Sequence, residues 1–283
     1  MPAIGQILKN AKQALSNQNI ESYALDADLL MCKATGLTRE KIICYPERII
    51  SDKQLDLFEE LLKRRINREP MSHILGVREF FGREFIVTAD TLDPRPDSEC
   101  LIEAILEIYK DRPKPENIID FGTGTGCLLL TVLSEFEDSK GIAVDKSKQA
   151  IEVARQNSIK LSLANRVEFV VSNWGKEVKG KYDLIISNPP YIRKNDITVL
   201  EPEVANFEPH SALDGGDNGL ACYIELAPYI ASLIARNGYA VIEHGLNQSN
   251  DVRSIMEDSG LEFVAAKKDL AGIDRCIILK SRI

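Results

Sequence analysis

Four consecutive residues, Asn188-Pro189-Pro190-Tyr191, combine polar and aromatic groups with a stiff backbone. They follow residues 182–187, an apolar segment without Gly or Pro that is typical of a buried strand. Because proline has no N–H and fixes φ at about −65°, two prolines in succession must end that strand. We therefore expect a rigid corner at the strand's carboxyl end, the edge at which open α/β sheets bind ligands. A plain strand terminator with a capping Asn is the alternative interpretation.

A glycine-rich loop lies between a predicted strand, 118–121, and a helix that starts at residue 127. Its sequence is Gly122-Thr123-Gly124-Thr125-Gly126. Glycine permits both a tight turn and the close approach of a ligand to the backbone. The spacing G-x-G-x-G differs from the G-x-G-x-x-G of dinucleotide-binding loops, so a nicotinamide-dependent oxidoreductase is disfavoured.

Polar residues also mark the ends of the neighbouring strands. Asp145 follows the strand at 141–144, and its carboxylate can accept hydrogen bonds from two ribose hydroxyls. Asn173 follows the strand at 167–171 and can bind an adenine edge, while Asp120 can order the glycine loop or meet a cationic ligand. Taken singly, these residues have simpler interpretations as caps, turns or solvated carboxylates. Their occurrence at successive strand ends predicts a nucleoside site beside Asn188.

The elements that must position these residues alternate between strand and helix from residue 118 onward, which predicts a mostly parallel α/β sheet. The last two strands, 261–264 and 276–279, are joined by a segment too short for a crossover helix and are predicted to be antiparallel. Residues 1–75 show helical apolar spacing, and residues 76–93 predict a β-hairpin. We therefore expect a helical domain at 1–75, a hairpin linker at 76–93 and a catalytic domain at 94–283.

Length and composition restrict the function classes. A chain of 283 residues favours two domains. The net charge is −8, with +1 in residues 1–75 and −9 in the remainder, and an acidic catalytic part disfavours a duplex nucleic-acid substrate. No apolar run of membrane-spanning length and no secretory signal is visible. Six scattered cysteines without C-x-x-C predict buried, reduced thiols in a cytoplasmic protein and no metal site.

Several polar residues have both a functional and a structural interpretation. Arg95, between two prolines, is held in one direction, or it pairs with a nearby carboxylate and shapes its loop. Ser98 or Asp97 is predicted to cap the helix that follows. His73 and His244 are expected to pack, with a role for His244 as a base as the alternative.

The glycine loop with its preceding Asp120, the acidic strand end at Asp145 and the Asn-Pro-Pro-Tyr sequence together resemble class I S-adenosylmethionine-dependent methyltransferases. Within that superfamily, the sequence Asn-Pro-Pro-Tyr is found in enzymes that methylate planar –NH2 groups. Four further stretches resemble the protein-(glutamine-N5) methyltransferases that act on peptide-chain release factors: 73–76, 94–99, 213–220 and 243–245. The sequence departs from that family's usual residues at Asp93, Ser98 and Asn218, which lie in loops outside the two main motifs.

This resemblance implies a Rossmann-like sheet with an antiparallel last strand and a helical substrate-recognition domain at 1–75. It implies S-adenosylmethionine as the cofactor, and a release factor as the protein partner, methylated at the glutamine of its Gly-Gly-Gln motif. The cofactor would contact Asn188 and the residues Gly122, Thr123, Gly124, Thr125, Gly126, Asp145 and Asn173. The catalytic set would be Asn188, Pro189 and Tyr191, and the substrate would also meet Pro190 and Arg95.

On this interpretation the Asn188 oxygen and the Pro189 carbonyl each accept one amide hydrogen, and the Tyr191 ring stacks on the amide plane. Two alternatives remain: an adenine-N6 or guanine-N2 nucleic-acid methyltransferase, and a cofactor-binding scaffold or sensor without catalysis. A basic cluster, Lys63, Arg64, Arg65 and Arg68, is either a solvated helix end or a docking site for an acidic surface of the factor.

Overall fold

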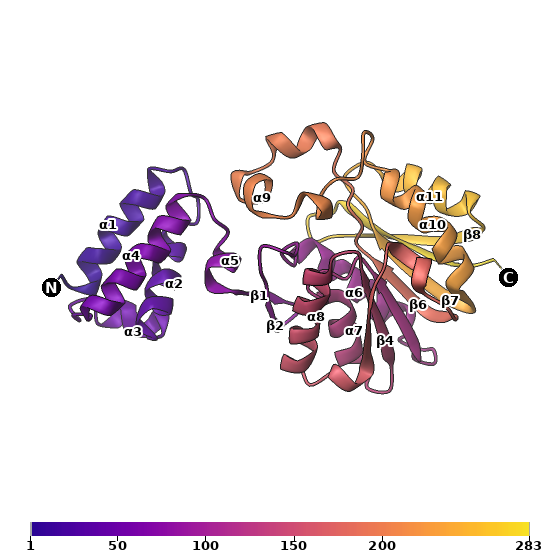
Figure 1. The fold of residues 1–283 in the computed structure, drawn as a ribbon, viewed down its shortest axis with the longest axis horizontal. Coiled ribbons are helices and arrows are strands. Elements are labelled where there is room, and N and C mark those ends of the chain that lie inside the picture. Colours follow the sequence, from indigo (N-terminus) through magenta and orange to yellow (C-terminus); the bar gives the residue numbers. More distant parts are fainter. Residues whose placement is uncertain (1, 283) are drawn as a thin grey trace. The chain divides into compact units, whose positions relative to one another are not determined.

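A computed structural model describes residues 2–282, and the chain forms two compact units (Figure 1). The first contains the described residues up to Gly76 together with Pro202–Phe207. The second contains Val77–Glu201 and the described residues from Glu208 onward. The hairpin expected to link two domains therefore groups with the second unit, and a short distant segment groups with the first.

The first unit is helical because apolar residues recur on one side of each helix and pack into one core. Phe58, Leu30 and Leu15 are among its fully buried side chains. The helix at Asp52–Ile66 starts with a capping box, in which Ser51 and Gln54 satisfy each other's backbone N–H groups. The helices of this unit are α1 (Ile4–Ser16), α2 (Tyr23–Thr35), α3 (Arg39–Cys44), α4 (Asp52–Ile66), α5 (Met71–Leu75) and α9 (Pro202–Phe207).

The basic cluster on α4 is largely neutralised within this unit. Arg65 is buried, and it lies 2.7 Å from Asp26 and 2.9 Å from Glu203 of α9. Arg68 lies 2.8 Å from the other oxygen of Glu203. Arg64 also has an internal partner, because it pairs with Glu69. All three arginines therefore form ion pairs within this unit, and docking of an acidic surface of the factor stays a prediction.

The second unit begins with an antiparallel hairpin of β1 (Val77–Phe80) and β2 (Arg83–Ile86). A mixed sheet follows in the order β5-β4-β3-β6-β7-β9-β8. Its strands are β3 (Asn117–Phe121), β4 (Lys140–Asp145), β5 (Val167–Val171), β6 (Tyr182–Ser187), β7 (Ile234–Glu243), β8 (Leu261–Lys268) and β9 (Asp274–Ser281). Pairing is parallel from β5 to β7, and β9 alone runs in the opposite direction. The predicted Rossmann-like sheet with an antiparallel last strand is confirmed.

Helices cover both faces of this sheet (Figure 1). The helices that supply the two apolar cores are α6 (Glu99–Ile108) and α7 (Cys127–Glu135) on one face, and α10 (Ala221–Leu233) and α11 (Ser249–Asp258) on the other. Helix α8 (Lys148–Lys160) packs against β4 and β5. Because the central strands are buried on both faces, they are apolar throughout instead of alternating. The polar residues that remain lie at the strand ends.

One buried side chain joins the hairpin, α8 and the glycine loop. Asn157 on α8 accepts a hydrogen bond from the Ile86 N–H at 2.7 Å and donates to the Ile86 carbonyl at 3.0 Å. It also donates to the Thr125 carbonyl at 2.9 Å. All three of these hydrogen bonds are made to backbone groups. The hairpin is thereby attached to the loop that precedes α7.

We expect Asn157→Ala to lower the free energy of unfolding by about 3 kcal/mol, because it leaves buried backbone groups without partners. Chemical denaturation of the purified variant measures this change. The control is Gln156→Ala, since Gln156 is an exposed neighbour on the same helix. Equal stability of the two variants would contradict the structural role of Asn157.

Two further observations concern the cysteines and the membrane. All six cysteines are free, as predicted, but the expectation that they are buried is wrong for most of them. Cys100 and Cys276 are buried, whereas Cys44 is exposed on its short helix and the rest are half-buried. Among residues 2–282, no helix is both long and apolar enough to cross a membrane.

Candidate active site

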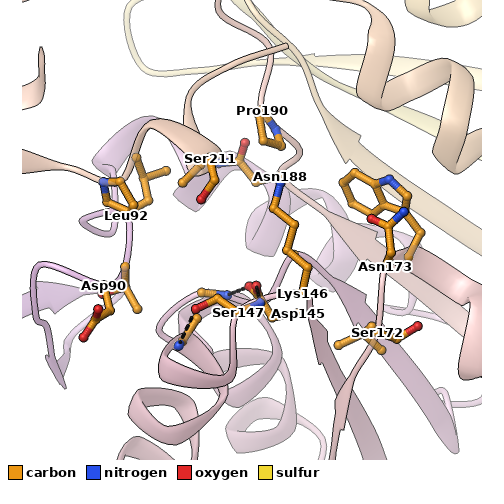
Figure 2. A pocket seen from close by; sticks show the side chains of 18 residues that line it. Asp90, Leu92, Asp145, Lys146, Ser147, Ser172, Asn173, Asn188, Pro190 and Ser211 are labelled. Atoms are coloured by element: carbon orange, nitrogen blue, oxygen red, sulfur yellow. Dashed lines mark hydrogen bonds between the residues drawn. The ribbon is translucent and has the colours of Figure 1, made fainter. Parts of the chain in front are cut away.

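A pocket opens at the carboxyl edge of the sheet, where the loops after β3, β4, β5 and β6 meet (Figure 2). It encloses about 690 Å³ of empty space, including the part that opens to solvent. Six predicted site residues line it: Gly122, Gly124, Asp145, Asn173, Asn188 and Pro190. The rule that parallel strands present their carboxyl ends at one edge accounts for this convergence.

The carboxylate of Asp145 is held in one orientation by backbone donors. The Gly124 N–H donates to Oδ2 at 3.0 Å, and the Ser147 N–H donates to Oδ1 at 2.9 Å. Gly124 adopts a positive φ of 54°, which favours glycine and lets its N–H turn toward the carboxylate. Burial raises the pKa of Asp145, and the two backbone donors oppose that shift. Each oxygen keeps a further acceptor site that can face the pocket.

Three residues of the glycine loop support the pocket from behind. The Thr123 hydroxyl donates to Asp120 at 2.7 Å, and the Thr125 hydroxyl accepts the Cys127 N–H at 3.3 Å. Gly126 lies so close to α7 and α8 that an added Cβ would meet Leu130 at 3.0 Å and Ala154 at 3.2 Å. None of these residues lines the pocket. They order the loop instead.

Asp120 is almost completely buried, and burial raises its pKa to about 7. One of its oxygens accepts the Thr123 hydroxyl, and the other has no hydrogen-bond partner among residues 2–282. Asp120 was predicted either to order the glycine loop or to meet a cationic ligand, and its hydrogen bond from Thr123 is a contact of the first kind.

Asn173 and Trp174, which follow the neighbouring strand β5, also line the pocket, and Figure 2 shows Asn173 there. Trp174 has a φ of 51°, and its indole N–H donates to Glu225 at 3.0 Å. The sequence analysis did not assign Trp174 to the site, although its position next to Asn173 was a usable signal. Lys146 and Ser147, directly after Asp145, also line the pocket. Val144, Ala150 and Ser172 lie near these residues in the chain and line the pocket too. Six further lining residues come from distant segments and carried no signal in the sequence: Asp90, Thr91, Leu92, Pro209, Ser211 and Ala212.

The Asn-Pro-Pro-Tyr corner is divided between the pocket and the protein interior. Asn188 and Pro190 line the pocket, whereas Pro189 is buried and does not. The Asn188 side-chain N–H donates to the Ser98 hydroxyl at 3.1 Å. The Tyr191 hydroxyl donates to the Glu243 carboxylate at 3.3 Å, so its ring is anchored by its polar end away from the pocket.

Ser98 does not cap α6 as predicted. Its hydroxyl donates instead to Glu243 at 2.6 Å, and no side-chain bond reaches the start of the helix. Asp97 does not cap the helix either, because its carboxylate accepts a hydrogen bond from Arg275 at 3.0 Å. The prediction was wrong because a buried carboxylate from a distant strand competes successfully for the Ser98 hydroxyl.

The glycine-rich segment at 213–220 packs against the corner. A Cβ on Gly219 would lie 2.5 Å from the Tyr191 carbonyl oxygen, and one on Gly215 would lie 2.8 Å from the Tyr191 Cα. Gln248 donates to both the Tyr191 and the Gly219 carbonyls, at 3.1 and 3.3 Å. The backbone of the corner is thus fixed by direct contact with a loop that has no room for side chains.

We expect Gly219→Ala to lower the rate of the catalysed reaction and to destabilise the second unit by roughly 1–3 kcal/mol, because the new Cβ must displace the Tyr191 backbone. The control is Gly272→Ala. Both glycines have positive φ, 77° and 79°, but Gly272 has open space around it. Thermal unfolding and turnover of the two variants measure the difference. Similar losses in both would show that backbone strain, and not close approach, is responsible.

Two candidate residues lie outside the pocket. Arg95 pairs with the buried carboxylate of Glu208 at 2.6 Å, in agreement with its simpler interpretation as a residue that shapes its loop. His244 is completely buried, its Nδ1 lies 3.0 Å from the Gly245 carbonyl, and burial lowers its pKa. A neutral, enclosed imidazole that does not line the pocket is placed for packing and not for proton transfer.

Comparison with known proteins places this geometry in context. Residues 6–76 match the family model described as the PrmC N-terminal domain, and residues 88–204 match the Methyltransferase small domain. A release factor glutamine methyltransferase of Rhodospirillum rubrum is 39% identical over 279 residues, which cover 99% of this chain and 85% of that protein. Another, of Agrobacterium fabrum, is 36% identical over 273 residues, covering 95% and 94%.

Among solved structures, a methyltransferase from Pyrococcus furiosus resembles this one with a TM-score of 0.54. It is 18% identical, and the match covers 72% of this chain and 91% of that chain. At this identity the likeness concerns the fold alone.

Proposed function

This chain belongs to the release factor glutamine methyltransferase family, and from that premise we propose that it methylates the side-chain amide nitrogen of a glutamine. The donor is S-adenosylmethionine, and the acceptor is the glutamine of the Gly-Gly-Gln motif in class I peptide-chain release factors. The observation that carries the proposal is the position of Asn188, which lines the same pocket as Gly122 and Asp145. The group that can hold a planar amide thus borders the space that can hold the donor.

The residues of the pocket fit S-adenosylmethionine. Asp145 has two fixed oxygens with acceptor sites left for ribose hydroxyls, and Gly122 and Gly124 present no side chain. Asn173 offers an amide for the adenine edge, and Trp174 offers an apolar wall beside it. When bound, the cofactor supplies an electrophilic methyl group on a sulfonium.

Asn188 and Pro189 position the acceptor. The lone pair of an amide nitrogen is delocalised into its carbonyl, so the nitrogen is a weak nucleophile and must be aimed. The Asn188 Oδ1 and the Pro189 carbonyl oxygen each accept one hydrogen of the –NH2 group in this proposal. Alignment of this kind can lower a barrier by about 7–11 kcal/mol in ideal cases, so a strong base is not required.

Pro190, Tyr191 and Arg95 complete the acceptor side. Pro190 contacts the substrate from the pocket wall, and Tyr191, which does not line the pocket, stiffens the corner through its hydrogen bond to Glu243. Arg95 acts through Glu208, whose neighbour Pro209 lines the pocket, and so shapes the loop that the substrate meets. These assignments use no metal ion.

The test is to incubate the protein with labelled S-adenosylmethionine and either a release factor or nucleic acid, and to locate the methyl group by mass spectrometry. We expect the label on the glutamine of the Gly-Gly-Gln motif. Label on nucleic acid alone would support the alternative adenine-N6 or guanine-N2 activity. A protein that binds the cofactor but labels neither would be a scaffold or sensor.

A further inference from the structure

A buried carboxylate lies behind the Asn-Pro-Pro-Tyr corner and is connected to it by a chain of hydrogen bonds. Glu243 ends β7, which runs parallel to β6 with Ile242 opposite Ser187. This register places Glu243 beside the point where Asn188 leaves the sheet. Glu243 is only 1% exposed. In this chain of hydrogen bonds, the Asn188 amide donates to the Ser98 hydroxyl at 3.1 Å, and that hydroxyl donates to Glu243 Oε2 at 2.6 Å.

The chemistry of these groups fixes the direction of both bonds. An ionised carboxylate only accepts hydrogen bonds, so Ser98 must use its single hydrogen to donate to Glu243. The Ser98 oxygen can then only accept, and of the two ends of the Asn188 amide only the –NH2 end can donate to it. The Oδ1 end is therefore turned away from Ser98. Tyr191 donates to the other oxygen of Glu243 at 3.3 Å, which leaves the carboxylate acting as an acceptor on both sides.

We infer that Glu243 and Ser98 are positioning residues that determine which end of the Asn188 amide faces the acceptor glutamine. Ionised Glu243 accepts a hydrogen bond from the Ser98 hydroxyl, the Ser98 oxygen accepts one from the Asn188 –NH2, and Oδ1 remains free to accept one from the substrate. This inference rests on the proposed function, because it assigns the orientation of the residue that holds the substrate amide. Neither Glu243 nor Ser98 lines the pocket, so both act through Asn188.

The same chain of bonds can reverse if Glu243 is protonated. A carboxylic acid can donate to Ser98, Ser98 can then donate to Asn188 Oδ1, and the amide turns its –NH2 end toward the substrate. The –NH2 group of Asn188 would then face the –NH2 group of the acceptor glutamine, and neither can accept a hydrogen bond from the other. Burial raises the pKa of Glu243 to about 7, while Ser98, Arg275 and Tyr191 favour the ionised form. The other titratable groups that act on it or bond to it are Asp97, Tyr223, Cys127 and Cys276.

The experiment compares Glu243→Gln with Ser98→Ala and Ser98→Thr. Glutamine has the size of glutamate but carries a donor, so it permits the reversed chain. We expect Glu243→Gln and Ser98→Ala to lower kcat for release-factor methylation about tenfold, the equivalent of one hydrogen bond. The KM for the factor and the Kd for S-adenosylmethionine should stay within about twofold. Ser98→Thr keeps the hydroxyl and should retain kcat.

The matched control is Ser139→Ala. Like Ser98, Ser139 has a buried hydroxyl. The Ser139 hydroxyl, however, donates to the Pro115 carbonyl, which lies outside the pocket. The changes in kcat and stability of Ser139→Ala show what the deletion of a buried hydroxyl costs elsewhere in this unit. Thermal unfolding of every variant separates lost stability from lost orientation.

The pH profile of kcat supplies a readout that a merely structural role would not change. For the wild type we expect kcat to fall as the pH drops through about 7, and for Glu243→Gln we expect this acid limb to disappear. A Glu243→Gln variant with wild-type kcat and an unchanged limb would overturn the inference, as would equal losses in Ser98→Thr and Ser98→Ala. The wild-type rate in the same assay tests the proposed function separately, because the inference concerns ratios between variants.

Discussion

Asn188→Ala is expected to lower the single-turnover rate of release-factor methylation by about a hundredfold, which is the typical effect of losing an exact reacting geometry. The substitution removes Oδ1, one of the two acceptors that hold the substrate –NH2 group in the proposed site. It leaves Asp145 and the glycine loop untouched, so the Kd for S-adenosylmethionine should change little. Rapid-quench measurement of methyl transfer and calorimetric titration of the cofactor measure the two quantities.

The control for Asn188→Ala is Asn195→Ala, an equivalent truncation at an exposed position a few residues farther along the chain. We expect this variant to keep the wild-type rate. Wild-type turnover in Asn188→Ala would sink the proposed amide clamp. A large loss of cofactor affinity in that variant would instead assign Asn188 mainly to the cofactor.

Asp145→Ala is expected to weaken S-adenosylmethionine binding by about a hundredfold or more. Hydrogen bonds to a charged acceptor contribute about 1.5–3 kcal/mol each, and the proposal has this carboxylate bind two ribose hydroxyls. The variant also removes the acceptor of the Gly124 and Ser147 N–H groups, so the loop that faces the cofactor loses its support. Calorimetric titration at fixed salt measures the change in Kd.

Asp183 offers a matched control for Asp145. Its carboxylate also accepts two backbone N–H groups, from Glu116 at 3.0 Å and Asn117 at 2.9 Å, but it lies at the start of β6, away from the pocket. Asp183→Ala should therefore reduce stability without reducing cofactor affinity. If both variants bound the cofactor equally well, Asp145 would have only a structural role.

The fold could be predicted in some detail because its signals are local. The apolar runs that form the central strands β3 and β6 have no alternation, which is what burial on both faces requires. The short connection between β8 and β9 excludes a crossover helix and dictates the antiparallel pair. The convergence of Asp145, Asn173 and Asn188 on one pocket follows from parallel pairing alone, since it needs only strand ends and not the positions of side chains.

The connection from Ser98 to Glu243 could not be predicted in this way. The two residues are 145 positions apart, and their contact depends on how the turn before α6 meets the end of β7. Local reasoning therefore assigned Ser98 to a cap. The ion pairs of the basic cluster could not be predicted for the same reason, because the carboxylate that pairs with Arg65 and Arg68 is Glu203, more than a hundred positions away. Sequence periodicity reports which face a residue occupies but not its distant partner.

The position of α9 has a consequence for how this protein can be divided. The chain leaves the second unit at Glu201, contributes α9 to the first unit, and returns at Glu208, directly before the pocket-lining Pro209. The N-terminal module is therefore discontinuous, and a cut after Gly76 does not release it intact. A fragment that starts at Val77 would retain Glu203 without Arg65 and Arg68. An exchange of N-terminal modules between members of the family must carry residues 202–207 along with the helices that hold them.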